Sequence, residues 1–185
     1  MDLRKPAAAA APRLGFGLLL SLTMMVPALP VAAQTPEVGV AVGKSGLQVP
    51  RFVSLKAGRV NVRVGPGEDY NVAWIFTRPG LPIEVIQEYD TWRRVRDSDG
   101  AVGWVFNSLL SGKRTAVVSP WAGSEPLPIR SSAAPEGAIT AYLQPGVMGT
   151  INKCRSGWCR IAGEGYAGWI PEEQLWGVYP DEEVD

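Results

Sequence analysis

The chain has 185 residues, with 18 basic and 18 acidic side chains, no histidine and two cysteines. A nucleic-acid-binding face needs clustered Lys and Arg. Here the basic residues are scattered, with "WRRVR" the densest group, so we expect no nucleic-acid partner. The lack of histidine excludes serine triads with a histidine base, Cys-His peptidase sites and histidine-ligated zinc.

The first 33 residues have the layout of a secretory signal peptide. Basic residues are followed by an apolar run from Leu14 to Val26 and by the small-residue sequence "VAA", which predicts cleavage after Ala33. A membrane anchor is the alternative. A spanning helix needs roughly 20 apolar residues, whereas this run reaches Pro27 after 13. We therefore expect a periplasmic or secreted protein with no stable membrane anchor after cleavage.

Residues 34–49 are small and weakly patterned, which predicts a disordered linker. From residue 50 onward the pattern is that of β-strands: "RVNVRV", "LPIEVI" and "WRRVR" alternate apolar with polar residues. The separators "GPGED", "RPG" and "DSDG" are turn sequences. Several short strands within about 60 residues indicate a small, strongly bent barrel.

The chain also repeats itself. "WCRIAGEGYAGWI" matches "WRRVRDSDGAVGWV", and the match extends in both directions. The repeat predicts two domains, at residues 50–112 and 113–179, followed by an acidic, solvated tail at 180–185. The join "SLLSGKRTAVV" leaves hardly any linker between the copies. We therefore expect two barrels packed against each other.

The first copy, "VNVRVGPGEDYNVAWIF" with "PGLPIEVI", "DTWRRVR" and "GAVGWVFNSLL", resembles the bacterial SH3-like (SH3b) domain. The second copy keeps "IR", "PG", "GWCRI" and "AGWI". It has lost the Gly-Pro after the Arg and carries the extra residues "WAGSEP". The resemblance implies an all-β protein of two tandem small SH3-like β-barrels.

The same resemblance implies a non-catalytic module of the cell envelope that needs no cofactor and recognises cell-wall peptide or glycan. The alternative is a structural or assembly adaptor that docks a periplasmic protein partner. A carboxylate pair remains as possible catalytic machinery, for example Glu68 with Asp69, but acidic residues are ordinary in a Gly-Pro turn. We therefore predict that the protein is not an enzyme.

Aromatic side chains are the candidate ligand contacts. Trp92 and Trp104 recur in the second copy as Trp158 and Trp169, which favours core packing, with a ligand groove as the alternative. Three aromatics in outward-facing loops are the first candidates for stacking on a peptide or sugar, beside Arg63 and Asp69: Tyr70, Trp74 and Trp121. Because both copies keep the arginine, a structural clamp on a loop carbonyl is the favoured role of Arg63 and Arg130.

Cys154 and Cys159 raise three alternatives: metal ligands, a redox centre or a disulfide. Structural zinc needs four ligands, the spacing is not Cys-X-X-Cys, and an exported protein meets an oxidising compartment. A disulfide is favoured. Superposing the repeats on Trp92 and Trp158 places the cysteines on Glu88 and Arg93, across a four-residue hairpin connection. We predict that the disulfide occupies the position that an ion pair holds in the first copy.

Overall fold

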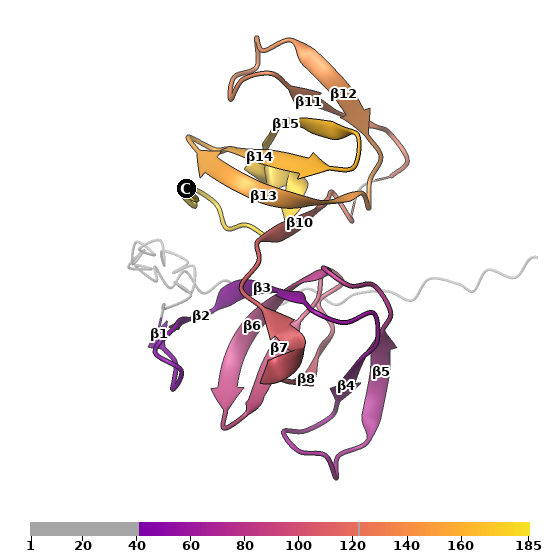
Figure 1. The fold of residues 1–185 in the computed structure, drawn as a ribbon, viewed down its shortest axis with the longest axis vertical. Coiled ribbons are helices and arrows are strands. Elements are labelled where there is room, and N and C mark those ends of the chain that lie inside the picture. Colours follow the sequence, from indigo (N-terminus) through magenta and orange to yellow (C-terminus); the bar gives the residue numbers. More distant parts are fainter. Residues whose placement is uncertain (1–40, 122) are drawn as a thin grey trace, which may run out of the picture. The chain divides into compact units, whose positions relative to one another are not determined.

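The structure is a computed structural model that describes residues 41–121 and 123–185 (Figure 1). The predicted signal peptide and residues 34–40 of the predicted linker lie outside this range. The described residues belong to one compact unit. No helix in the described part of the chain is long and apolar enough to cross a membrane.

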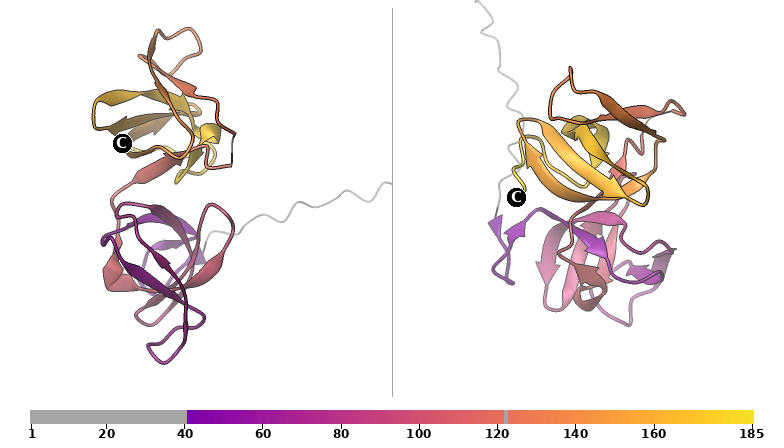
Figure 2. Two further views of the ribbon diagram at one scale, coloured as in Figure 1. Left: turned by 90° about the vertical axis from the view of Figure 1, so that its right-hand side faces the viewer. Right: turned by 45° about the horizontal axis from the view of Figure 1, so that its top comes forward.

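The first barrel is a seven-stranded antiparallel sheet, strongly bent on itself (Figures 1 and 2). Its spatial order is β5-β4-β8-β7-β6-β3-β9, and a 3₁₀ turn, η1, precedes the last strand. Alternate residues face a core of valine, isoleucine and leucine side chains, as the period-2 pattern predicts. The elements are β3 (Arg51–Leu55), β4 (Val60–Arg63), β5 (Val72–Phe76), β6 (Pro82–Tyr89), β7 (Trp92–Arg96), β8 (Val102–Phe106), η1 (Asn107–Leu109) and β9 (Leu110–Ser111).

The second barrel repeats this topology strand for strand, in the order β12-β11-β15-β14-β13-β10-β16. The prediction of two tandem small all-β barrels is therefore confirmed. Its elements are β10 (Thr115–Val118), β11 (Leu127–Arg130), β12 (Ile139–Leu143), β13 (Met148–Arg155), β14 (Trp158–Gly163), β15 (Tyr166–Pro171), η2 (Glu172–Gln174) and β16 (Leu175–Trp176).

The repeated Gly-Trp motif has a steric explanation. Gly103 lies where β8 passes β4, and a Cβ atom there would overlap the Val62 side chain and lie 3.1 Å from the Arg63 carbonyl oxygen. Gly168 is its counterpart, where a Cβ atom would lie 3.0 Å from the Arg130 carbonyl oxygen. Only glycine lets these two strands approach so closely in both barrels.

The cysteine prediction is confirmed. Cys154 and Cys159 are opposite one another on β13 and β14 and form a disulfide, and in the first barrel Glu88 and Arg93 are opposite one another. The Arg93 Nε lies 3.3 Å from the Glu88 Oε1. The connection is shorter than expected, because Arg155 also pairs with Trp158 and leaves a two-residue turn. Both turn residues, "SG", have positive φ, as such tight hairpins require.

The N-terminal linker differs from the expectation of disorder. Within it, β1 (Ala41–Val42) pairs with β2 (Gln48–Val49) as a short hairpin. The connecting loop reaches the first barrel, where Ser45 donates hydrogen bonds from its backbone N (2.8 Å) and its Oγ (2.7 Å) to the Glu88 carboxylate. The weak local pattern concealed this hairpin because its anchor lies 43 residues away in the sequence.

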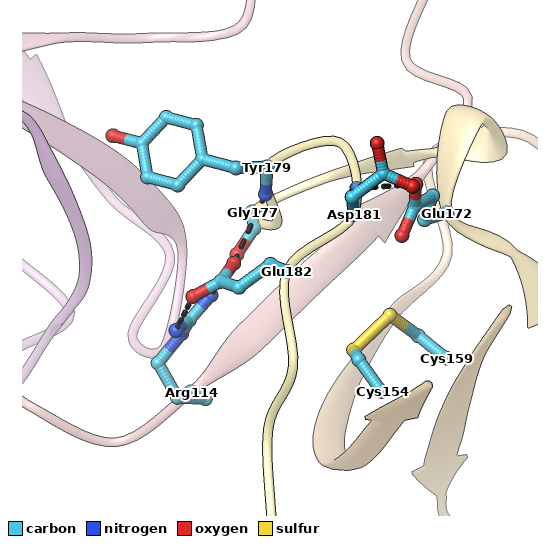
Figure 3. Close-up of a disulfide and its surroundings, with 8 residues drawn as sticks. All are labelled: Arg114, Cys154, Cys159, Glu172, Gly177, Tyr179, Asp181 and Glu182. Atoms are coloured by element: carbon cyan, nitrogen blue, oxygen red, sulfur yellow. Dashed lines mark hydrogen bonds and ion pairs between the residues drawn. A yellow bond between two sulfur atoms is a disulfide. The ribbon is translucent and has the colours of Figure 1, made fainter. Parts of the chain in front are cut away.

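The acidic tail is likewise attached to a barrel rather than free in solvent. Val184 exchanges backbone hydrogen bonds with Cys154, at 2.8 and 3.2 Å. Glu182 accepts two hydrogen bonds from the Arg114 guanidinium, at 2.6 and 2.9 Å. Figure 3 shows this tail segment beside the disulfide hairpin. The prediction of a solvated tail was therefore wrong for these residues.

The two barrels contact one another directly, as the short join predicts. The Trp176 indole Nε1 donates to the Pro82 carbonyl oxygen (3.1 Å), and the Tyr179 hydroxyl donates to the Glu84 carboxylate (2.9 Å). The Phe52 ring lies 5.0 Å from the Trp176 ring and 4.7 Å from the Tyr179 ring, centroid to centroid. An aromatic cluster with two hydrogen bonds thus joins the barrels.

Candidate functional site

The Arg63 side chain fixes the long loop that follows β4. Its Nη1 donates to the carbonyl oxygens of Glu68 (2.9 Å) and Tyr70 (2.6 Å). In the second barrel, the Arg130 Nη1 donates to the Gly137 carbonyl oxygen (2.9 Å), again seven residues along the chain. The clamp interpretation therefore describes both arginines.

A groove lies on the outer face of the first barrel, beside this clamped loop. It has a volume of about 260 Å³ and is lined by side chains of β4, β7 and β8, with the loop on one side: Arg59, Asn61, Arg63, Glu68, Trp92, Phe106 and Leu109. We call it the Trp92 groove. Because Trp92 and Phe106 are opposite one another on neighbouring strands, their side chains share a face, and the rings meet edge to face at 5.5 Å.

The aromatic face continues beyond the groove. Tyr89 is opposite Trp92, and its ring lies edge to face with Trp104 at 6.4 Å. Trp92 is only 8% exposed, whereas Tyr89 is 54% exposed. The face therefore combines a fixed aromatic floor with one accessible ring, and the guanidinium groups of Arg59 and Arg63 lie at its groove end.

The other predicted contacts lie elsewhere. The Tyr70 ring packs over Gly65 and Gly67 within its own loop, and neighbouring Asp69 is exposed. Trp74 packs against the core of the first barrel. Trp121 is 57% exposed but belongs to the second barrel. The structure thus brings together Arg63 and Trp92, with Trp104 alongside, and leaves these four residues outside the Trp92 groove.

The second barrel has a different outer face. Arg155 takes the position of Tyr89, and its Cζ lies 4.9 Å from the centre of the Trp169 ring, the counterpart of Trp104. Pro171 is opposite Trp158, where the first barrel has Phe106 opposite Trp92. A cation already covers the aromatic surface there. The accessible aromatic face belongs to the first barrel.

Sequence reasoning missed five groove-face residues: Arg59, Asn61, Tyr89, Phe106 and Leu109. The available signal was strand alternation, which places Asn61 on the face of Arg63 and Phe106 on the face of Trp104. The aromatic rings of the groove can stack on a planar or apolar ligand, and its arginine and asparagine side chains can donate hydrogen bonds to that ligand. No group of three or more potential metal ligands occurs among residues 41–121 and 123–185.

Comparisons with known proteins give distant matches. The chain is 24% identical over 123 residues, or 63% of its length, to the "Putative N-acetylmuramoyl-L-alanine amidase YrvJ" of Bacillus subtilis (strain 168). It spans only 24% of that protein. Among solved structures it resembles NlpC2 and NlpC1 of Trichomonas vaginalis, each at 17% identity, with TM-scores of 0.34 and 0.33. These matches cover 69% and 76% of this chain and 48% and 50% of those chains.

The family assignment rests on a match to each barrel. The family model of the bacterial SH3 domain matches residues 56–112 and, separately, residues 123–177. These two ranges make up more than half of the chain and correspond to the two seven-stranded sheets. The chain therefore belongs to the bacterial SH3 domain family, of which it carries two tandem copies.

Proposed function

We propose that this protein is a non-catalytic binding module of the cell envelope, which recognises cell-wall peptide or glycan with the first barrel. The observation that carries the proposal is the Trp92 groove with its aromatic neighbours. Sugar rings and peptide groups both stack on aromatic side chains that are flanked by hydrogen-bond donors. Asn61, Arg59 and Arg63 supply the donors at this site.

The family and the relative support the choice of ligand. The relative is named "Putative N-acetylmuramoyl-L-alanine amidase YrvJ", and this chain matches about a quarter of it. Export by a cleaved N-terminal signal peptide would bring the module to its ligand. The proposed location is accordingly the periplasm or the cell exterior.

The side chains of this protein favour binding without catalysis. The chain has no histidine, and both cysteines are joined to each other. Glu68 is the one carboxylate among the groove-lining side chains, and a glycosidase needs a pair of carboxylates about 5–10 Å apart across the bond to be cleaved. The protein should leave wall fragments chemically unchanged during long incubation.

Co-sedimentation with purified peptidoglycan sacculi tests the proposal. The test variant is Arg59→Ala/Tyr89→Ala, which removes two exposed side chains of the face and leaves the core intact. Its matched control is Tyr142→Ala/Arg160→Ala, which removes an exposed tyrosine and an exposed arginine from the second barrel. We expect the test variant to raise the Kd at least about tenfold, since Tyr and Arg dominate binding interfaces, and the control to bind normally.

Two results would reject the proposal. One is wild-type protein that stays in the supernatant with sacculi, which would favour the adaptor function and a periplasmic protein partner. The other is equal loss of binding in the test variant and its control, which would place recognition away from the Trp92 groove.

A further inference from the structure

A larger pocket, separate from the Trp92 groove, lies where the N-terminal hairpin, the first barrel and the C-terminal tail meet. Its volume is about 930 Å³, within the range of small-molecule sites. We call it the hairpin pocket. Most of its lining residues lie outside the ranges that match the bacterial SH3 domain. The hairpin and the tail, which lie outside the matched ranges, thus complete this pocket against the first barrel.

Arg93 makes this pocket chemically selective. Its side chain is only 9% exposed, yet it lines the pocket. The Nε faces Glu88 at 3.3 Å, and the Nη1 donates to the carbonyl oxygens of Asp90 and Trp92, each at 2.9 Å. Within the part of the chain that the structure describes, the Nη2 has no acceptor. A buried guanidinium with a spare donor is suited to an oxyanion.

The charges around the pocket also favour an anion. Three guanidinium groups line it, those of Arg51, Arg93 and Arg114. They face two carboxylates: Glu88 pairs with Arg51 (2.8 Å) as well as Arg93, and Glu182 pairs with Arg114. One positive charge remains in excess among these side chains.

Part of the lining is apolar. Leu47, the last residue of the hairpin loop, is 55% exposed, and Phe52 and Pro180 lie in the same lining, together with the polar residues Ser45, Gln48 and Asn107. A single anionic group beside apolar walls fits a ligand that carries both a carboxylate and a hydrocarbon side chain. An inorganic anion would leave these walls facing water.

We propose that the hairpin pocket binds the free C-terminal end of a peptide, with the terminal carboxylate on Arg93 and the apolar side chains against Leu47 and Phe52. Two sources carry this chemistry: the stem peptides of the cell wall, which end in D-amino acids, and the C-terminus of a protein, which ends in an L-amino acid. The proposal is independent of the Trp92 groove.

Titration of the exported protein with short peptides tests the site, with backbone amide NMR signals as the readout. The probes are N-acetyl-Leu-L-Ala and N-acetyl-Leu-D-Ala, each as the free acid and as the C-terminal amide. We expect the acid to bind at least about tenfold more tightly than its amide, because a charge-assisted hydrogen bond is lost. The shifted signals should fall in residues 45–53. A preference for the D- or the L-form identifies the source.

Variants at Leu47 report on the pocket without disturbing the barrel, because this side chain is exposed. Leu47→Glu should weaken binding of the free-acid peptide, because its carboxylate repels the peptide carboxylate. Leu47→Lys should strengthen that binding, and Leu47→Gln supplies the uncharged control. If the D-form is preferred, binding to sacculi should change in the same order in these variants. If the L-form is preferred, binding to sacculi should remain unchanged in all three. Equal affinity for acid and amide, or signals that shift at Asn61, Arg63 and Glu68 in the Trp92 groove instead, would overturn the proposal.

Discussion

The disulfide offers the sharpest test of how the second barrel is stabilised. The variant Cys154→Ala/Cys159→Ala removes the cross-link without placing a polar group in the core, where the two cysteines are 2% and 0% exposed. The closed loop spans a sequence separation of only 5, for which the chain-entropy relation gives about 2 kcal/mol. Replacement of both cysteines by serine should lower the free energy of unfolding by roughly 1–3 kcal/mol more than replacement by alanine, because it buries hydroxyl groups.

Differential scanning calorimetry measures this loss of stability as a decrease in Tm. If the second barrel unfolds alone, about 2 kcal/mol lowers its Tm by roughly 8–16 °C. If both barrels unfold together, the loss is about 4–8 °C. The contacts of Trp176 and Tyr179 with the first barrel favour the joint transition and the smaller shift. An unchanged Tm in the alanine variant, or free thiols in the native protein, would refute this reasoning.

An ion pair should not replace this disulfide. Glu88 is stabilised by Ser45 and Arg51 in addition to Arg93. Cys154 and Cys159 instead lie in an apolar cluster against Val184 and other hydrophobic side chains. The variant Cys154→Glu/Cys159→Arg should therefore be less stable than the double alanine variant, measured in the same calorimeter. Greater stability would show that the two positions are interchangeable.

Three further predictions concern the first barrel and the junction. Burial opposes ionisation of Glu88, but hydrogen bonds from its neighbours lower its pKa from 4.5 to about 2. The unfolded chain therefore binds more protons over this interval, so stability should fall as the pH drops from about 4.5 to 2, with a shallower loss in Glu88→Gln. Gly103→Ala should cost about 1–3 kcal/mol in urea unfolding, whereas Gly112→Ala, with nothing within 4 Å of the added methyl, should be neutral. Tyr179→Phe should lose roughly 1.5–3 kcal/mol of stability, because it removes a hydrogen bond to the buried Glu84 carboxylate.

The barrels could be predicted from the sequence because their determinants are local and repeated. Strand alternation, turn sequences and the Gly-Trp motif each occur twice, and the repeat itself placed Cys154 opposite Cys159. The same comparison placed Glu88 opposite Arg93. Periodicity also predicted which faces are buried, including those of Val62 and Val95.

The attachments at both ends could not be predicted in this way. Ser45 reaches Glu88, and Val184 pairs with Cys154, across many residues and without any local pattern. The candidate site was predicted only in part, because sequence position alone does not show whether a loop side chain packs within its own loop. Tyr70 was selected as an aromatic in an outward-facing loop, but the loop glycines Gly65 and Gly67 hold its ring.

The indole N–H signals of tryptophan in NMR spectra give the most direct test of the proposed function. The chain has seven tryptophans, and Trp92 and Trp158 occupy equivalent positions in the two barrels. Solubilised cell-wall fragments should shift the Trp92 signal, while the Trp158 signal stays in place. A shift of Trp158 without Trp92, or no shift of either in protein that still binds sacculi, would contradict the assignment of recognition to the Trp92 groove.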